Sequence, residues 1–194
     1  MNLLRTNRIN TYKADEYATS EVFRKVFTED MAGLYLLSFL LTASHEKAEQ
    51  CFVAGLEDCV KRNSVFKEWA RSWAKRTIVH NAIQTIAPRP TRASESFAEI
   101  QREADHKRQE TQDQHHAIAS VLVLVGFDRF VFVMSVLERY TEKECSVLLG
   151  CSQQDVREAR IRALQQIAEY TKHNSARHGD PIQSSSRLPE LQVH

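Results

Sequence analysis

The chain has 194 residues, enough for one medium domain or two small ones. Hydrophobic residues make up 42% and charged residues 26%, an ordinary balance for a soluble globular protein, and a formal net charge of +1 gives no basic excess that would point to nucleic acid. The longest apolar run, Leu34 to Leu41, is too short to cross a bilayer as a helix, and no secretory signal is visible. We therefore expect a cytoplasmic protein with no membrane association.

The first half of the chain predicts a small helical domain. Only five glycines and four prolines are present, which favours an all-α fold. Residues 1–19 carry no strong period and form an N-terminal lead-in. Over 20–87, three apolar stripes at helical spacing predict three amphipathic helices around one core. The stripes are Leu34, Leu37, Leu40 and Leu41; Phe52, Leu56, Cys59 and Val60; and Phe66, Trp69 and Trp73.

A linker and a second helical domain follow. Pro88 and Pro90 end the helical pattern, and the strongly charged residues 88–117 are typical of a linker. Valine-rich blocks open the segment 118–171, and we interpret them as helices because no hairpin signal separates them. Residues 172–194 contain Ser, His and Pro and are expected to be a disordered tail.

No catalytic or metal-binding pattern stands out. The four cysteines form no CxxC pair and no zinc-finger spacing, so we expect reduced thiols, mostly in the core: Cys51, Cys59, Cys145 and Cys151. The adjacent His115 and His116 do not share a helix face. Because a nucleophile elbow and a phosphate loop are also missing, we expect no enzyme, no catalytic residue, no metal and no cofactor.

The sharpest local signal predicts a helix-turn-helix over Thr141 to Leu164. Thr141 and Glu144 form a T-x-x-E capping box that starts one helix. Gly150 ends it, because glycine takes the left-handed conformation cheaply, and Ser152 with Asp155 caps the next helix. Two helices joined by a tight glycine turn are typical of a DNA-binding unit whose second helix enters the major groove.

The second helix of this pair has one apolar face and one polar face. Its apolar face is predicted to hold Val156, Ala159, Ala163, Leu164 and Ile167. The residues expected to face DNA are Ser152, Gln153, Gln154, Arg157, Glu158, Ile161 and Arg162. Gln can read adenine, Arg can read guanine or bind phosphate, and Glu can accept from cytosine. A plain αα-hairpin with a solvated polar face is the alternative interpretation.

These residues resemble the C-terminal domain of the extracytoplasmic-function class of bacterial sigma factors. The family pattern is a V-F pair, a leucine-rich stretch, and then S/T-x-x-E-I-A-x-x-L-G-x-S-x-x-x-V-K/R. The matching positions here are Val131, Phe132, Val136, Leu137, Glu138, Thr141, Glu144, Leu148, Leu149, Gly150, Ser152, Val156 and Arg157, with Arg162 and Ala163 matching a following R-A. The family has a proline where this chain has Gly126, a leucine at Arg160 and commonly a DNA-contacting arginine at Ala159.

The first half is similar to the other domain of that family. Leu34 to Thr42 looks like its opening helix, Ala48-Glu49 matches its A-E-D element, and Phe66 to Ile83 looks like the helix that melts the −10 element. The resemblance implies two helical domains, sigma region 2-like and sigma region 4-like, joined by a linker. It implies core RNA polymerase and promoter DNA as partners, with an anti-sigma factor as a further candidate partner.

The resemblance also assigns sites in the first half. For the −10 strand these are the basic ridge Lys67, Arg71, Lys75 and Arg76, with Trp73 beside it. Cations next to aromatic rings suit single-stranded DNA, although tryptophans at this spacing are also typical of a core. For polymerase the residues are Glu49, Gln50, Val53 and Glu57. Gln50, Val53 and Ala54 replace the family's Asp, Gln and Glu, which removes polar contacts to the polymerase clamp.

The sequence thus leads to a sigma factor that directs promoter-specific initiation, reading −10 with its first domain and −35 with its helix-turn-helix. Two alternatives stay open. One is a sigma-like protein that binds DNA or a regulator but does not recruit polymerase. The other is a helix-turn-helix regulator with an unrelated sensing or dimerisation domain.

Overall fold

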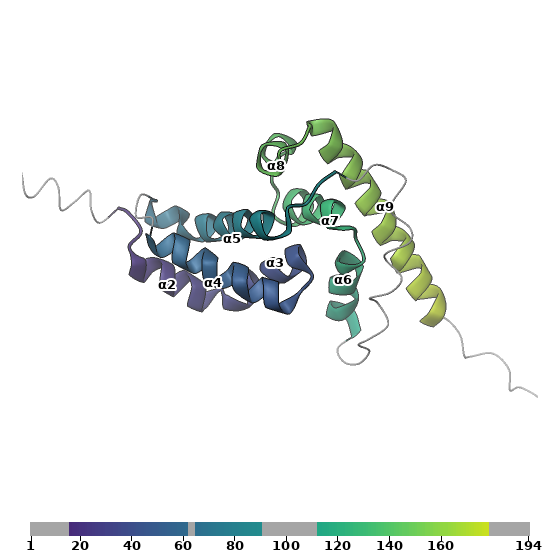
Figure 1. Ribbon diagram of the computed structural model, residues 1–194. Helices are drawn as coiled ribbons and strands as arrows, with labels where there is room; N and C mark the ends of the chain where they lie inside the picture. Colours follow the sequence, from purple (N-terminus) through teal and green to yellow (C-terminus); the bar gives the residue numbers. More distant parts are fainter. Residues whose placement is uncertain (1–15, 62–64, 91–111, 179–194) are drawn as a thin grey trace, which may run out of the picture.

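The protein is all-α. The computed structural model describes residues 16–61, 65–90 and 112–178 (Figure 1). Within these ranges every long element is a helix, and the only extended pairing is an isolated bridge between Tyr17 and Phe66. The predicted fold class is therefore confirmed. No helix within these ranges is long and apolar enough to span a membrane.

The first half contains four long helices rather than the three predicted. They are α2 (Ser20–Glu29), α3 (Met31–Thr42), α4 (His45–Lys61) and α5 (Ala70–Ile86). The additional helix, α2, buries Phe23 and Phe27, one turn apart, against the others. The end of α5 at Ile86 agrees with the helix stop expected before the two prolines.

Trp69 is not part of the core as its spacing predicted. The chain before α5 forms a short 3₁₀ turn, η1 (Lys67–Trp69), which breaks the α-helical period between Phe66 and Trp73. Phe66 instead stacks on Tyr17, with ring centroids 4.9 Å apart. Trp69 remains 57% exposed.

Small residues on α4 let it lie close to α5. The buried residues of α4 are Ala48, Cys51, Gly55 and Cys59, and the larger members of the predicted stripe are only half-buried. A Cβ built on Gly55 would lie 2.9 Å from Cγ1 of Ile78 on α5, inside normal contact distance. Gly55 therefore serves close helix packing, which outweighs its poor helix propensity.

The second half is also helical. It consists of α6 (Gln112–Leu122), α7 (Gly126–Phe132), a π-helical turn η2 (Val133–Leu137), α8 (Glu142–Leu149) and α9 (Gln153–His178). The valine-rich blocks are helices, as predicted. Helix α6 begins inside the predicted linker 88–117, and α9 extends into the predicted tail 172–194. Residues 91–111 and 179–194 of these segments, and 1–15 of the predicted lead-in, lie outside the described residues.

The two halves pack against each other over one continuous core. Helix α3 contacts α6, α7 and η2, and α5 contacts α8 (Figure 1). Arg129 on α7 is buried between them: its guanidinium donates to the carbonyl of Leu124 at 3.1 Å and to that of Leu41, on α3, at 3.5 Å. The prediction of two domains joined by a linker did not include this interface.

Candidate nucleic-acid interface

The predicted helix-turn-helix forms, with both helix starts capped. Thr141 Oγ1 accepts from the N–H of Glu144 at 3.2 Å, and the Glu144 carboxylate accepts from the N–H of Thr141 at 2.9 Å. Ser152 and Asp155 repeat this exchange at the start of α9, at 3.1 and 2.9 Å. Between them Gly150 has φ +65°, the left-handed turn expected of it. These bonds fix the angle at which α9 leaves the turn.

Both capping carboxylates are stabilised in their charged form. Backbone and side-chain hydrogen bonds from Thr141 lower the pKa of Glu144. The side chain and then the backbone of Ser152 lower the pKa of Asp155 in the same way. The two caps are therefore strongest when the carboxylates are ionised.

The first turns of α9 present a polar face to solvent. Gln153, Gln154, Arg157 and Glu158 are all exposed, and the side chain of Ile161 is 55% exposed. On the opposite side Val156, Ala159 and Ala163 are fully buried. The structure thus gathers six of the seven residues predicted to face DNA, including the cap residue Ser152, on one accessible surface.

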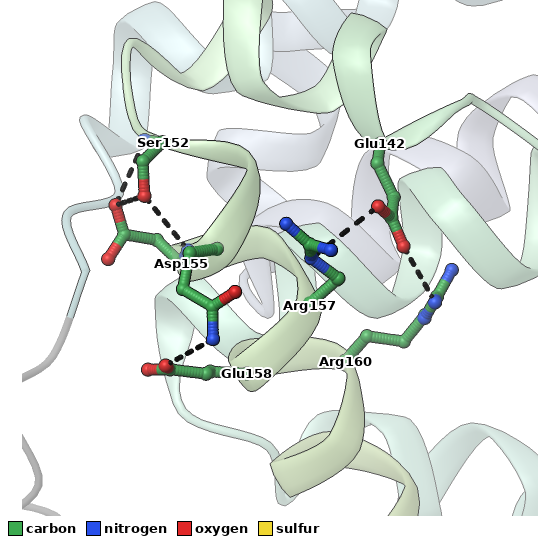
Figure 2. Close-up of polar contacts among 7 residues, drawn as sticks. Glu142, Ser152, Asp155, Arg157, Glu158 and Arg160 are labelled. Atoms are coloured by element: carbon green, nitrogen blue, oxygen red, sulfur yellow. Dashed lines mark hydrogen bonds and ion pairs between the residues drawn. The ribbon is translucent and has the colours of Figure 1, made fainter.

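Contacts within this surface are of two strengths. Figure 2 shows Glu142 between two arginines: Arg160 donates to one carboxylate oxygen at 2.8 Å, whereas Arg157 lies 3.7 Å from the other. Gln154 donates to Glu158 at 2.8 Å. The Arg157 side chain is half-exposed and its ion pair is long, so it is the arginine on this face that can turn to a new partner.

Arg162, the seventh predicted residue, has a different place. It donates from Nε and Nη2 to both carboxylate oxygens of Asp128 on α7, at 3.0 and 2.7 Å. The Asp128 side chain is only 4% exposed. Asp128 holds the pKa of Arg162 above its usual range. This two-point pair ties α9 to α7, so the structure gives Arg162 a role in the fold.

One prediction about the apolar face of α9 is wrong. Leu164, predicted for the apolar face, is 47% exposed, because that face passes through Val156, Ala159 and Ala163 and leaves Leu164 on its edge. Ala159 is fully buried, as predicted for the apolar face, so the position at which the resembled family commonly carries an arginine is a core position here. Arg160 is half-buried at the edge of this face and donates outward to Glu142.

The second predicted surface forms one wall of a large groove. An open groove of about 1040 Å³ lies between α5 and the segment that joins η2 to α8. Four of the five predicted −10 residues line it: Arg71, Trp73, Lys75 and Arg76. The fifth, Lys67, is exposed on η1 and does not line it.

The opposite wall was missed in the sequence. It contains Glu138, Arg139 and Tyr140, which follow η2. Glu138 accepts two hydrogen bonds from Nζ of Lys75 at 3.0 and 3.2 Å, and this pair bridges the two halves. No local pattern predicts such a contact, because the two residues belong to separate sequence blocks and meet only through tertiary packing.

The predicted polymerase-binding residues share one exposed face of α4. Glu49, Gln50, Val53 and Glu57 succeed one another at helical spacing and are all exposed. Val53 is 48% exposed amid polar neighbours. Among the residues that the structure describes, the polar side-chain contacts of this face are intrahelical: Gln50 donates to Glu46 at 3.4 Å, and Lys61 pairs with Glu57 at 3.1 Å.

The cysteines lie as expected for free thiols. Cys51, Cys59 and Cys145 are buried and Cys151 is half-buried, all without disulfides. Over the described ranges, no three His, Cys, Asp or Glu side chains come together in a way that could hold a metal ion. Searches against models of known protein families and against curated proteins found no match to this chain.

Proposed function

We propose that this protein is a DNA-binding transcription factor of the sigma type, with α9 as its duplex-reading helix. One observation carries the proposal: two consecutive capping boxes around the left-handed Gly150 hold α9 so that its polar first turns face solvent. A helix of these dimensions fits the major groove, and its first turns are the part that contacts base edges.

The residues on those turns suit base reading. Gln153 and Gln154 can each pair with adenine, and Arg157 can pair with guanine or with a phosphate. Arg157 needs to give up only a long, solvent-screened ion pair to do so. Ile161, exposed one turn on, offers an apolar contact of the kind that thymine methyl groups make.

The other two surfaces fit the same function. The cations and Trp73 on α5 supply phosphate contacts and a stacking ring for a single strand. The outer face of α4 is an accessible, largely polar surface with Val53 at its centre, available for a protein partner such as core RNA polymerase. Duplex binding, strand capture and polymerase docking would then use three separate helices.

Duplex binding is tested with Arg157→Gln. Fluorescence anisotropy on promoter-length duplexes should show affinity weakened by about 1–3 kcal/mol, with a salt dependence reduced by about one charge. The matched control is Lys172→Gln, which removes the same charge from an exposed site farther along α9. Equal loss in both variants would show that only overall charge matters and would refute base reading by α9.

Polymerase docking is tested by run-off transcription with bacterial core polymerase. The wild-type chain should direct initiation, and Val53→Arg should abolish it while leaving duplex affinity unchanged. Met31→Arg places the same side chain at an exposed site on α3 and should retain activity. Duplex binding without any polymerase complex would replace the sigma function with the alternative of a regulator that does not recruit polymerase.

A further inference from the structure

The groove between the two halves contains more positive charge than its carboxylates balance. Its cationic side chains are Lys61, Arg71, Lys75, Arg76 and Arg139, and its acidic ones are Glu138 and Glu144. Glu138 is bound by Lys75, and Glu144 serves the cap of α8. Within the described residues, Arg76 and Arg139 form no ion pair. Two guanidinium groups without a direct ion pair, from opposite walls, therefore share one groove, and the charge of Arg76 also acts on the nearby Glu144 carboxylate.

Aromatic side chains accompany this charge. Trp69, Trp73 and Tyr140 line the same groove, and Trp69 is largely exposed. Nε1 of Trp73 is buried and has no hydrogen-bond partner among the described residues. An indole N–H can only donate, and leaving it unsatisfied in the interior costs about 1–3 kcal/mol. Of these groups, the guanidinium groups and the largely exposed ring of Trp69 are accessible in the groove, whereas the Trp73 N–H is buried.

We propose that this groove binds a nucleotide, with phosphate on Arg76 and Arg139 and the base stacked on Trp69. Guanidinium groups bind phosphate oxygens in pairs, and nucleobases stack on indole rings. Pockets of about 300–1000 Å³ at the boundary of two packed units are typical small-ligand sites. The ligand would touch both halves at once, so its binding holds them in the packed arrangement. This inference does not depend on the function proposed for α9 or α4.

The protein carries its own probe for this site. The chain has two tryptophans, and both line the groove, so intrinsic tryptophan fluorescence reports directly on it. Purified full-length protein is titrated with ATP, GTP, pyrophosphate, adenosine and a short single-stranded oligonucleotide, up to millimolar concentration, with absorbance correction. A nucleotide should change the fluorescence saturably and bind more tightly than pyrophosphate or adenosine, because each of these has only one of the two recognised groups.

Two variants remove one guanidinium each. Arg76→Gln acts at an exposed residue of α5, and Arg139→Gly acts at a residue with φ +60°, where glycine fits the backbone better than arginine. Each should weaken nucleotide binding by about tenfold or more, the scale of one charged hydrogen bond. Arg24→Gln, at an exposed guanidinium on α2 away from the groove, is the matched control and should bind like wild type.

A third variant should act in the opposite direction. Glu138→Gln releases Lys75 and adds one net positive charge to the groove, so nucleotide affinity should rise several-fold. A gain of this kind cannot come from misfolding. The proposal is overturned if no nucleotide changes the fluorescence, if only the oligonucleotide binds, or if Arg24→Gln weakens binding as much as the groove variants do.

Discussion

The pair between Arg162 and Asp128 gives the sharpest test of how the structure divides fold from function on α9. Arg162→Ala leaves the Asp128 carboxylate, 4% exposed, without its two hydrogen bonds. Breaking a buried pair by removing one partner costs about 3–5 kcal/mol. The Arg162 side chain is 32% exposed, so water entering the vacated space recovers part of that cost. We expect a loss of about 2–3 kcal/mol in the free energy of unfolding.

Arg157→Ala is the matched control on the same helix. The Arg157 side chain is 50% exposed and lies 3.7 Å from Glu142, which keeps its bond to Arg160. Exposed pairs contribute about 0–1 kcal/mol, so this substitution should barely change stability. The loss of stability in Asp128→Asn should lie between those of Arg162→Ala and Arg157→Ala, because the unpaired charge that it leaves is on the partly exposed Arg162, which water can reach.

Urea unfolding followed by circular dichroism measures all three. With a denaturant slope of about 2 kcal/mol per M, the midpoint of Arg162→Ala should fall by about 1 M. Equal midpoints for Arg162→Ala and Arg157→Ala would refute the structural role of Arg162 and return it to the predicted DNA-facing set. The comparison also identifies the arginine substitution that would change DNA binding indirectly, by lowering the stability of the fold.

Three further predictions concern packing, thiols and caps. Gly55→Ala should destabilise by about 1 kcal/mol despite better helix propensity, because its Cβ meets the buried Ile78, whereas Gly126→Ala, with nothing within 4 Å, should be neutral or stabilising in thermal melts. Burial raises the pKa of Cys145 to about 11, so thiol labelling at neutral pH with peptide mapping should modify the half-buried Cys151 first and leave Cys145 unmodified until unfolding. The capping carboxylates of α8 and α9 have lowered pKa values in the folded state, so the stability that they give is present at neutral pH and is lost as the pH falls below about 4. Replacing both with amides should make the free energy of unfolding, measured in urea titrations, fall less steeply over this acid range. An unchanged fall would contradict the role of the two caps.

Local sequence predicted the helix-turn-helix because its determinants are local. A capping box needs only residues three apart, and the left-handed turn needs only Gly150. The pattern Thr141, Glu144, Gly150, Ser152 and Asp155 therefore gave both helix starts and the turn. Helical periodicity and the scarcity of glycine and proline likewise indicated the all-α class, and Pro88 and Pro90 indicated the end of α5, because these signals are also local.

The sequence could not predict what depends on contacts between distant segments. Arg162 has the same polar character as Arg157, and only the position of Asp128 on α7 separates their roles. Helix propensity alone disfavours Gly55 in α4, and only its contact with Ile78 on α5 explains why a glycine stands there. The sequence spacing of Trp69 predicted a place on the apolar face of a helix, but the 3₁₀ turn Lys67–Trp69 breaks the α-helical period there.

In the packed arrangement, the three candidate surfaces differ in how accessible they are to a partner. The polar face of α9 and the outer face of α4 are exposed as the chain stands, so neither needs a rearrangement to meet a partner. On α5, Lys75 is bound by Glu138 from the other half, and a strand that is to use this lysine must displace that carboxylate. The proposed function therefore has an order: duplex reading and protein docking are available first, and strand capture follows once the contact between the halves at Glu138 is broken.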